Sequence, residues 1–279
     1  MSPALGGVLA IWGLAWWLNA RAVRAGGWVG RIIPPVFFGA TLLGLWEISV
    51  RTFDVSPVLL PAPSAIAVRL VESWDIIWID LVQTFFRGAL TGYLIGCGAA
   101  ILTGVIVDRI PFLRRGLLPV GNFVSALPII GMAPIMVMWF GFDWHSKAAM
   151  VVLMVYFPML VNTVQGLAAA DSLQQNLMRT YAASYRQTLF KLRLPAAAPS
   201  LFNGLKICTT LALIGAIVAE FFGSPTRGMG FRISTEVGRL ALDMVWAEIT
   251  VAALVGSAFY GAVAFAERLA TFWHPSQRA

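Results

Sequence analysis

Charged residues are scarce in this chain of 279 residues. Asp, Glu, Lys and Arg make up 12% of the sequence, against about 25% in an ordinary soluble domain, and 59% of the residues are hydrophobic. So few charges cannot cover the surface of a soluble globule of this size, and the excess apolar surface requires lipid. The composition therefore argues against a water-soluble enzyme and against a DNA-binding domain.

The residues that build most catalytic and metal sites are also few. Two histidines are present, His145 and His274, and no pair of histidines or cysteines has the spacing of a zinc site. Both cysteines, Cys97 and Cys208, lie inside apolar stretches, so we expect buried, inert thiols. The sequence also lacks a phosphate-binding loop and the Gly-x-Ser-x-Gly elbow of hydrolases. It therefore predicts no enzymatic activity, no catalytic residue, no metal site and no cofactor bound by this chain.

Long apolar runs dominate instead. A membrane-spanning helix needs about 20 mostly apolar residues, and seven segments approach that length: about 4–20, 32–50, 81–107, 117–140, 148–167, 200–222 and 244–266. The first is followed by Arg21 and Arg24 rather than preceded by basic residues, which favours a retained helix over a signal peptide. We predict an all-α integral membrane protein with six core helices and one extra N-terminal helix.

The basic residues indicate the orientation of these helices. The segments 21–31, 108–115 and 168–194 and the C-terminal tail hold most of the arginines and lysines, whereas the opposite loops hold fewer basic and more acidic residues. Positively charged loops stay in the cytoplasm, so we place these segments inside. One external loop, about 51–80, is polar, and we expect Ser64 to N-cap a short amphipathic helix over 65–73.

Three glycines mark one face of the third span. Gly88, Gly92 and Gly96 recur every four residues, and the missing side chains let another helix approach closely in lipid. The approaching helix can belong to the same chain or to a second copy. The spacing alone leaves both possibilities open.

Prolines interrupt the fourth span. Pro119, Pro128 and Pro134 each remove a backbone hydrogen bond from a helix. Broken backbone at membrane depth is tolerated where it is buried in protein or lines a watery cavity. The segment is therefore a cavity wall or a kinked packing helix.

Charged residues within the predicted spans lie near the helix ends: Glu47, Arg87, Lys206, Glu220 and Glu248. An ion-coupled carrier needs an ionisable group nearer the middle of the membrane. Their positions therefore weigh against such a carrier, which stays the main alternative as a stand-alone secondary transporter. A membrane scaffold is the other alternative.

The segment after the fifth span is the most informative part of the chain. Its pattern predicts two short helices with a turn near 182–184, and it contains Arg179, Arg186, Lys191 and Arg193. Such a basic hairpin at the membrane face is either a solvated loop or a docking element. It resembles the coupling loop of bacterial ABC importer permeases, which reads Glu-Ala-Ala, three residues, Gly, nine residues and Ile-x-Leu-Pro. The matching positions here are Asn176, Leu177, Met178, Ala182, Leu192, Leu194 and Pro195.

Two positions of this segment depart from the family pattern. Asn176 replaces the glutamate, and Ala182 replaces the glycine. Because alanine seldom adopts a left-handed conformation, Ala182 suggests a turn without one. These two departures affect the contacts expected between this segment and its docking partner, and they leave the resemblance to the family intact.

Further motifs resemble one branch of that family, the nitrate, sulfonate and taurine permeases. They are Leu60-Pro61-Ala62-Pro63-Ser64, Ala126-Leu127-Pro128, Ala133-Pro134, Trp139-Phe140-Gly141, Phe157-Pro158 and Ala219-Glu220-Phe221-Phe222-Gly223. Their order and spacing cover about residues 32–270. The resemblance implies a permease domain at 32–270 with a coupling hairpin at about 168–195, preceded by an extra helix and basic linker at 1–31 and followed by a tail at 271–279.

The resemblance also implies the partners. These are a second copy of the chain, two ATP-binding cassette ATPase subunits that bind ATP and magnesium, and an external binding protein, all at the bacterial inner membrane. The residues expected to couple to the ATPase are Asn176, Arg179, Thr180, Ala182, Ala183, Ser184, Tyr185 and Pro195.

The solute is expected to pass polar or adaptable side chains within the apolar spans. The candidates are Ser125, Pro128, Met132, Pro134, Tyr156, Asn162, Thr209 and Thr210. The alternative is a structural role, in which the hydroxyl groups form hydrogen bonds with the backbone of their own helices. The branch carries small anions such as sulfonates, and also aromatic or heterocyclic precursors, and the sequence does not choose between them.

Overall fold

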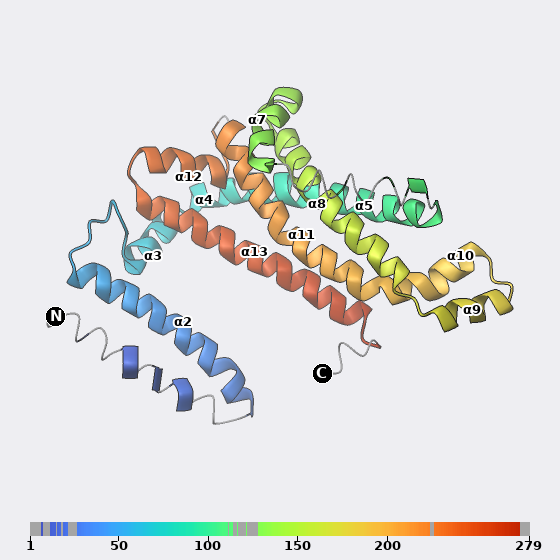
Figure 1. Ribbon diagram of the computed structural model, residues 1–279. Helices are drawn as coiled ribbons and strands as arrows, with labels where there is room; N and C mark the ends of the chain where they lie inside the picture. The colour runs from blue at the N-terminus through green and yellow to red at the C-terminus, as the bar shows by residue number, and fades with distance from the viewer. Residues whose placement is uncertain are drawn as a thin grey trace. The chain divides into compact units, whose positions relative to one another are not determined.

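The structure is a computed structural model that describes residues 7, 12–14, 16–17, 19–21, 27–110, 112–113, 116, 121, 128–223 and 226–273. Within this part of the chain the regular elements are all helices (Figure 1). They are α2 (Gly27–Thr52), α3 (Pro63–Glu72), α4 (Trp74–Leu81), η1 (Val82–Leu90), α5 (Thr91–Arg109), α7 (Ile129–Phe140), α8 (Trp144–Ala168), α9 (Ser172–Thr180), α10 (Tyr185–Thr188), η2 (Leu189–Arg193), α11 (Leu194–Gly223), α12 (Met229–Gly238) and α13 (Leu242–Ala270).

Among the described residues, five helices are long and apolar enough to cross a membrane. They are Ile33–Thr52, Trp74–Arg109, Trp144–Ala168, Tyr185–Gly223 and Leu242–Ala270, and Ile130–Phe140 is a shorter apolar helix. This confirms the all-α membrane fold. Most of the predicted first helix lies outside the described residues, as does most of the fourth span before Pro128, including Ser125.

The third membrane helix begins earlier than the sequence indicates. We expected a polar loop to reach residue 80, but α4 begins at Trp74 and continues through η1 into α5. The expectation failed because Asp80 was treated as a loop residue. Its carboxylate is instead buried and receives hydrogen bonds from Gly228 and Arg232, so it lies within the protein at little cost.

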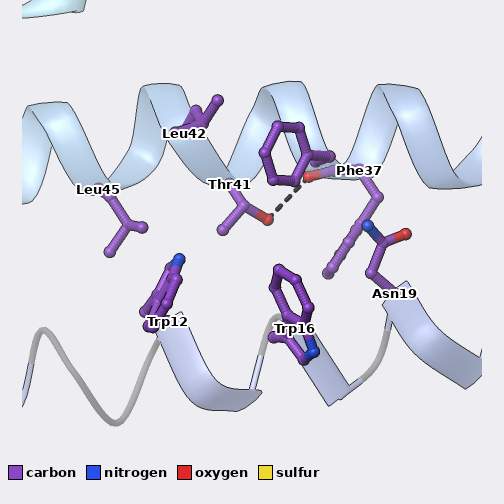
Figure 2. Close-up of a pocket in the computed structure, with 8 residues that line it drawn as sticks. Trp12, Trp16, Asn19, Phe37, Thr41, Leu42 and Leu45 are labelled. Atoms are coloured by element: carbon purple, nitrogen blue, oxygen red, sulfur yellow. Dashed lines mark hydrogen bonds between the residues drawn. The ribbon is translucent and has the colours of Figure 1, made fainter.

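Contacts divide the chain into two compact units, residues 1–74 with 235–248, and residues 75–234 with 249–279. In the first unit, Arg69 forms an ion pair of 2.7 Å with Asp243, and the rings of Trp46 and Trp246 meet edge to face at 5.0 Å. Trp12 and Trp16 from the N-terminal segment line a small crevice against α2, together with Phe37 and Thr41 (Figure 2).

Ser64 does not cap the short helix as predicted. Helix α3 begins two residues earlier than predicted, at Pro63, with Ala62 as its N-cap. The fixed φ of proline suits the first helical position, and Ser64 therefore lies inside the first turn. Its backbone N–H and hydroxyl both donate to Glu47 of α2, at 2.9 and 2.8 Å, so the Leu-Pro-x-Pro-Ser motif joins the end of α2 to the start of α3.

In the second unit, α8 packs against both α5 and α11. A cluster of small and flexible side chains fills one region of this core: Ala133 and Met136 of α7, Met150 of α8 and Ala219 of α11. A second cluster joins Leu167, Leu189 and Ala197 at the ends of α8, η2 and α11. The ends that carry the α9–α10 hairpin are therefore held in a packed core.

Two segments of the second unit are π-helices, η1 at Val82–Leu90 and η2 at Leu189–Arg193. A π-helix forms backbone hydrogen bonds between residues five apart rather than four, and it is found frequently at functional sites. The hydroxyl of Thr91 donates to the carbonyl of Phe86, five residues earlier, at 3.0 Å. Hydrophobic periodicity cannot reveal such segments because they read as ordinary apolar helix.

Candidate functional site

The predicted hairpin is formed by two short helices that extend beyond the ends of α8 and α11 (Figure 1). The side chain of Asp171 caps α9 by accepting a hydrogen bond from Leu173 N at 3.3 Å. Ser184 and Gln187 form a reciprocal capping box at the start of α10. Local sequence therefore defines both helix starts and places the turn at residues 181–184.

The turn corrects one expectation. Ala182 has a φ of 49°, the left-handed conformation that glycine adopts without strain. The prediction that Ala182 avoids this conformation was wrong. The turn lies between the end of α9 at Thr180 and the capping box that begins at Ser184, and Ala182 adopts the left-handed conformation within it.

The base of the hairpin is anchored to α5. Arg193 forms an ion pair with Asp108, whose side chain is only 3% exposed. The hydroxyl of Tyr185 lies 3.3 Å from Asp108 Oδ2 and 3.4 Å from the carbonyl of Val105. The guanidinium of Arg109 lies 5.4 Å above the ring of Tyr185. These contacts attach the second arm of the hairpin, formed by α10 and η2, to α5.

The outer surface of the hairpin is exposed and partly apolar. Leu173, Leu177, Tyr181 and Phe190 are exposed by 55% to 76%. The expected coupling residues lie on the same hairpin: Asn176, Arg179, Thr180, Ala182 and Ser184 are exposed, Ala183 and Tyr185 are half-buried, and Pro195 lies in the first turn of α11. An anchored base beneath an exposed apolar tip is suited to docking.

The expected solute-path residues lie in several environments. Pro128 and Pro134 are exposed, and Met132 packs against the Ala133–Met136 cluster. The hydroxyl of Tyr156 donates to Thr103 of α5 at 3.0 Å. The described members of this set therefore lie in separate local environments.

Two others bond back to their own helices. Thr209 is 1% exposed and donates to Lys206 O at 2.7 Å. Asn162 donates to Pro158 O at 2.9 Å, and it also accepts a hydrogen bond from Asn203 at 3.3 Å. Thr210 differs from Thr209 because it is exposed and lines a groove between α11 and α13.

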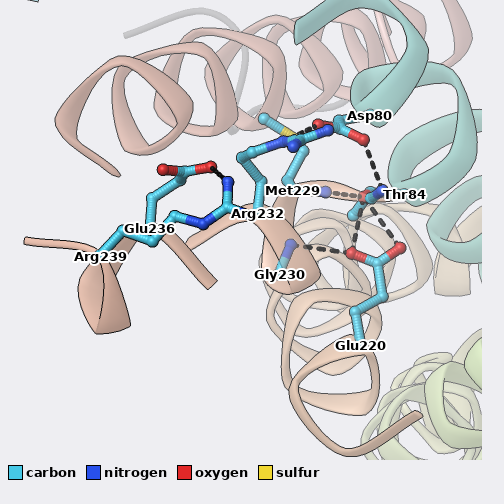
Figure 3. A network of polar contacts seen from close by, with 9 residues as sticks. Asp80, Thr84, Glu220, Met229, Gly230, Arg232, Glu236 and Arg239 are labelled. Carbon is cyan, nitrogen blue, oxygen red and sulfur yellow. Dashed lines mark hydrogen bonds and ion pairs between the residues drawn. The ribbon is translucent and has the colours of Figure 1, made fainter. Parts of the chain in front are cut away.

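A buried polar network lies at the other end of α11 (Figure 3). Thr84 Oγ1 of η1 lies 2.8 Å from Oε2 of Glu220, and it accepts a hydrogen bond from Met229 N at 2.8 Å. Glu220 also accepts from Gly230 N at 2.9 Å. The two carboxylates of Glu220 and Asp80 thus face the N–H groups at the start of α12, where the helix dipole favours negative charge.

Lys147 places a positive charge at the C-terminal end of α11. Its side chain is fully buried, and its ammonium donates to the carbonyls of Phe142, Asp143 and Gly223. A cation stabilises a helix C-terminus for the same electrostatic reason. The sequence pointed to Glu220 as a membrane charge, but nothing in it indicated that Asp80 and Thr84 complete the network.

The three glycines of the third span lie against α8. A Cβ added to Gly92 would lie 2.5 Å from Val151 Cβ, and one added to Gly96 would lie 2.5 Å from Val155 Cγ2. The corresponding distance from Gly88 to Lys147 Cβ is 3.3 Å. This face of the helix is therefore occupied by a helix of the same chain.

Comparisons with known proteins agree on one family. Residues 92–272 match the family model described as binding-protein-dependent transport system inner membrane component. A formylaminopyrimidine transport permease protein of Halalkalibacterium halodurans is 31% identical over 88% of this chain and 98% of its own length. A putative aliphatic sulfonates transport permease protein of Bacillus subtilis is 28% identical over 92% and 94%.

A taurine transport system permease protein of Escherichia coli is 26% identical over 84% of this chain and 87% of its own length. An inward-facing structure of the MetNI methionine ABC transporter has the same fold, with a TM-score of 0.55 at 19% identity, covering 71% of this chain and 95% of that one. The chain belongs to the binding-protein-dependent transport system inner membrane component family, and it is the inner-membrane permease component of a bacterial ABC importer.

Proposed function

We propose that this permease works as a homodimer that two ATP-binding cassette subunits drive through the α9–α10 hairpin. Magnesium and ATP bind to those subunits, and an external binding protein delivers the solute. The observation that supports this most directly is the anchored hairpin with exposed apolar side chains along α9 and into the turn, Leu173, Leu177 and Tyr181.

The anchor explains how movement of an ATPase reaches the membrane helices. A loosely attached loop would absorb a displacement at its tip. Here the second arm is joined to α5 through Asp108 and packed through Leu189 against α8 and α11. Closure of the ATPases would therefore move the helices as rigid bodies, as in other switches of this kind.

The solute path is proposed between the segment 117–140 and the helices 148–167 and 200–222. Met132, Asn162 and Thr210 remain candidates for its wall. The names of the relatives point to two kinds of solute, sulfonates such as taurine and heterocycles such as formylaminopyrimidine.

Co-purification from the native membrane tests the docking proposal. The tagged wild-type chain is expected to retain an ATPase subunit in about equal amount after mild solubilisation. Replacing Leu177 and Tyr181 together by Asp should abolish that retention, because both side chains are exposed on one side of α9 and its end. The control is Ser172→Asp, which adds one such negative charge to the exposed start of α9.

Each outcome has a clear meaning. Loss in the double variant with retention in Ser172→Asp supports docking through the hairpin tip. Equal retention in all three proteins would show that the ATPase binds elsewhere. Failure of the wild-type chain to retain any ATPase would contradict the proposed assembly itself.

A further inference from the structure

One face of α11 exposes polar side chains at membrane depth. Asn203 and Thr210 are both exposed, as are Ile207 and Ile214 between and beyond them. Positions seven residues apart lie on the same side of an α-helix. Thr210 is the seventeenth residue of this 30-residue helix, so it lies near the middle of the span. Polar side chains at that depth are disfavoured against lipid and favour the interior of a helix bundle or a water-filled cavity.

The amide of Asn203 extends this face onto α8. Asn203 Nδ2 donates to Asn162 Oδ1 at 3.3 Å, and Asn162 Nδ2 in turn donates to Pro158 O at 2.9 Å. The interior Pro158 has no N–H, and its helix therefore has altered backbone bonding here. The pair joins α8 to α11 with an uncharged amide at the surface.

Beside this face lies a groove of about 550 Å³ between α11 and α13. Three of its lining residues bear hydroxyl groups, namely Thr210, Ser257 and Tyr260, and the others are aliphatic or glycine. None of the described side chains that line it is charged. The groove therefore offers apolar walls with a few hydrogen-bonding groups, the composition typical of small-molecule sites.

The lysine of α11 is neutralised by a carboxylate of α13. Lys206, four residues before Thr210, forms an ion pair of 2.7 Å with Glu267 of α13, and both side chains are mostly buried. A paired lysine does not attract an anion as an unpaired one would. The face thus presents hydrogen-bond donors and acceptors without net charge.

We propose that Asn203, Thr210, Ser257 and Tyr260 form a wall of the solute path and that the solute is an uncharged heterocycle. This inference rests on the proposed importer function. Flat ring faces suit the aliphatic walls, and ring nitrogens, carbonyls and amino groups suit the amide and hydroxyls. A sulfonate would lose its hydration here without gaining a compensating cation.

The reactivity of introduced cysteines tests whether water reaches this face of α11. The two native cysteines are 3% and 0% exposed, so the wild-type background is low. Thr210→Cys and Asn203→Cys, in membrane vesicles with the ATPase present, should react with the water-soluble reagent trimethylammonioethyl methanethiosulfonate. Two controls should not react, Thr209→Cys on the buried side of α11 and Leu254→Cys on an exposed apolar side of α13.

Protection then identifies the solute class. Formylaminopyrimidine should slow modification of Thr210→Cys several-fold in vesicles that retain the ATPase, whereas methanesulfonate should not. Protection by methanesulfonate alone, or by neither solute, would overturn the inferred class while the importer assembly stands. If neither Thr210→Cys nor Asn203→Cys is modified, the proposal that these positions line the solute path is overturned. Loss of ATPase from the wild-type vesicles would instead count against the proposed function.

Discussion

Arg193 of η2 forms an ion pair with Asp108 at the end of α5, and this contact fixes the base of the hairpin to the membrane core. The two residues are 85 positions apart in the sequence. Because the Asp108 side chain is 3% exposed and that of Arg193 is 18% exposed, little water screens the pair. Its removal should therefore affect both stability and the transmission of movement.

Replacing Asp108 by Asn should leave the Arg193 charge buried without its partner. We expect a loss of about 3 kcal/mol of stability, typical of breaking a buried pair on one side. Transport should fall more than ATP hydrolysis, since the hairpin would remain docked but loosely attached. Thermal unfolding in detergent and the ratio of transported solute to hydrolysed ATP measure these effects.

Arg193→Gln and the double variant complete a mutant cycle. If the pair acts as described, the double variant should be less damaged than the sum of the single changes. Additive losses would show that the two residues act independently.

Ala182→Gly should stabilise the hairpin turn. The left-handed conformation costs a non-glycine residue about 1 kcal/mol, and Ala182 has a φ of 49°. Amide hydrogen exchange at Ala183 and Ser184 should slow accordingly. Ala183→Gly is the matched control, because Ala183 lacks a positive φ and should lose stability on gaining freedom. Faster exchange in Ala182→Gly would contradict the strain.

Thr84→Val should weaken the network at the start of α12. Valine keeps the shape of threonine but can neither donate to Glu220 nor accept from Met229 N. We expect a loss of about 2 kcal/mol because buried polar groups lose their partners. Thr84→Ser retains the hydroxyl and should cost clearly less. Equal losses in the two variants, measured by thermal unfolding, would assign the effect to packing.

Gly92→Ala should strain the contact between α5 and α8. The added Cβ would lie 2.5 Å from Val151 Cβ and 2.6 Å from the carbonyl of Ala148. Overpacking of this kind costs about 1–3 kcal/mol. Gly98→Ala, on the same helix with nothing within 4 Å, should be neutral or stabilising. A stable, monodisperse Gly92→Ala protein with unchanged unfolding temperature would refute the close approach.

Hydrophobicity predicted the membrane helices well because lipid leaves so few alternatives. The errors arose where one residue makes a specific contact. Asp80 was assigned to a loop because its partners, Gly228 and Arg232, lie 148 and 152 positions away. Ser64 was assigned as a cap because its partner Glu47 lies on another helix.

The candidate site was predicted unevenly for the same reason. The hairpin was recognisable because its caps and turn are local, as at Ser184 and Gln187. The strain at Ala182 was missed because alanine seldom adopts a left-handed conformation, so the residue type itself argues against one. In the solute path, sequence could not separate the buried Thr209 from the exposed Thr210, since neighbouring positions differ only in the direction they face on the helix.

The π-helix η1 also marks where this sequence can change in length. A π-turn takes up one residue more than an α-turn, so a single deletion between Phe85 and Leu90 can close the turn to ordinary α-helix while the segments on either side keep nearly their present facing. The same deletion within α5 would rotate everything before it by about 100° about the helix axis and turn Thr84 away from Glu220. Single-residue deletions should therefore be tolerated better in η1 than in the regular helix that follows it.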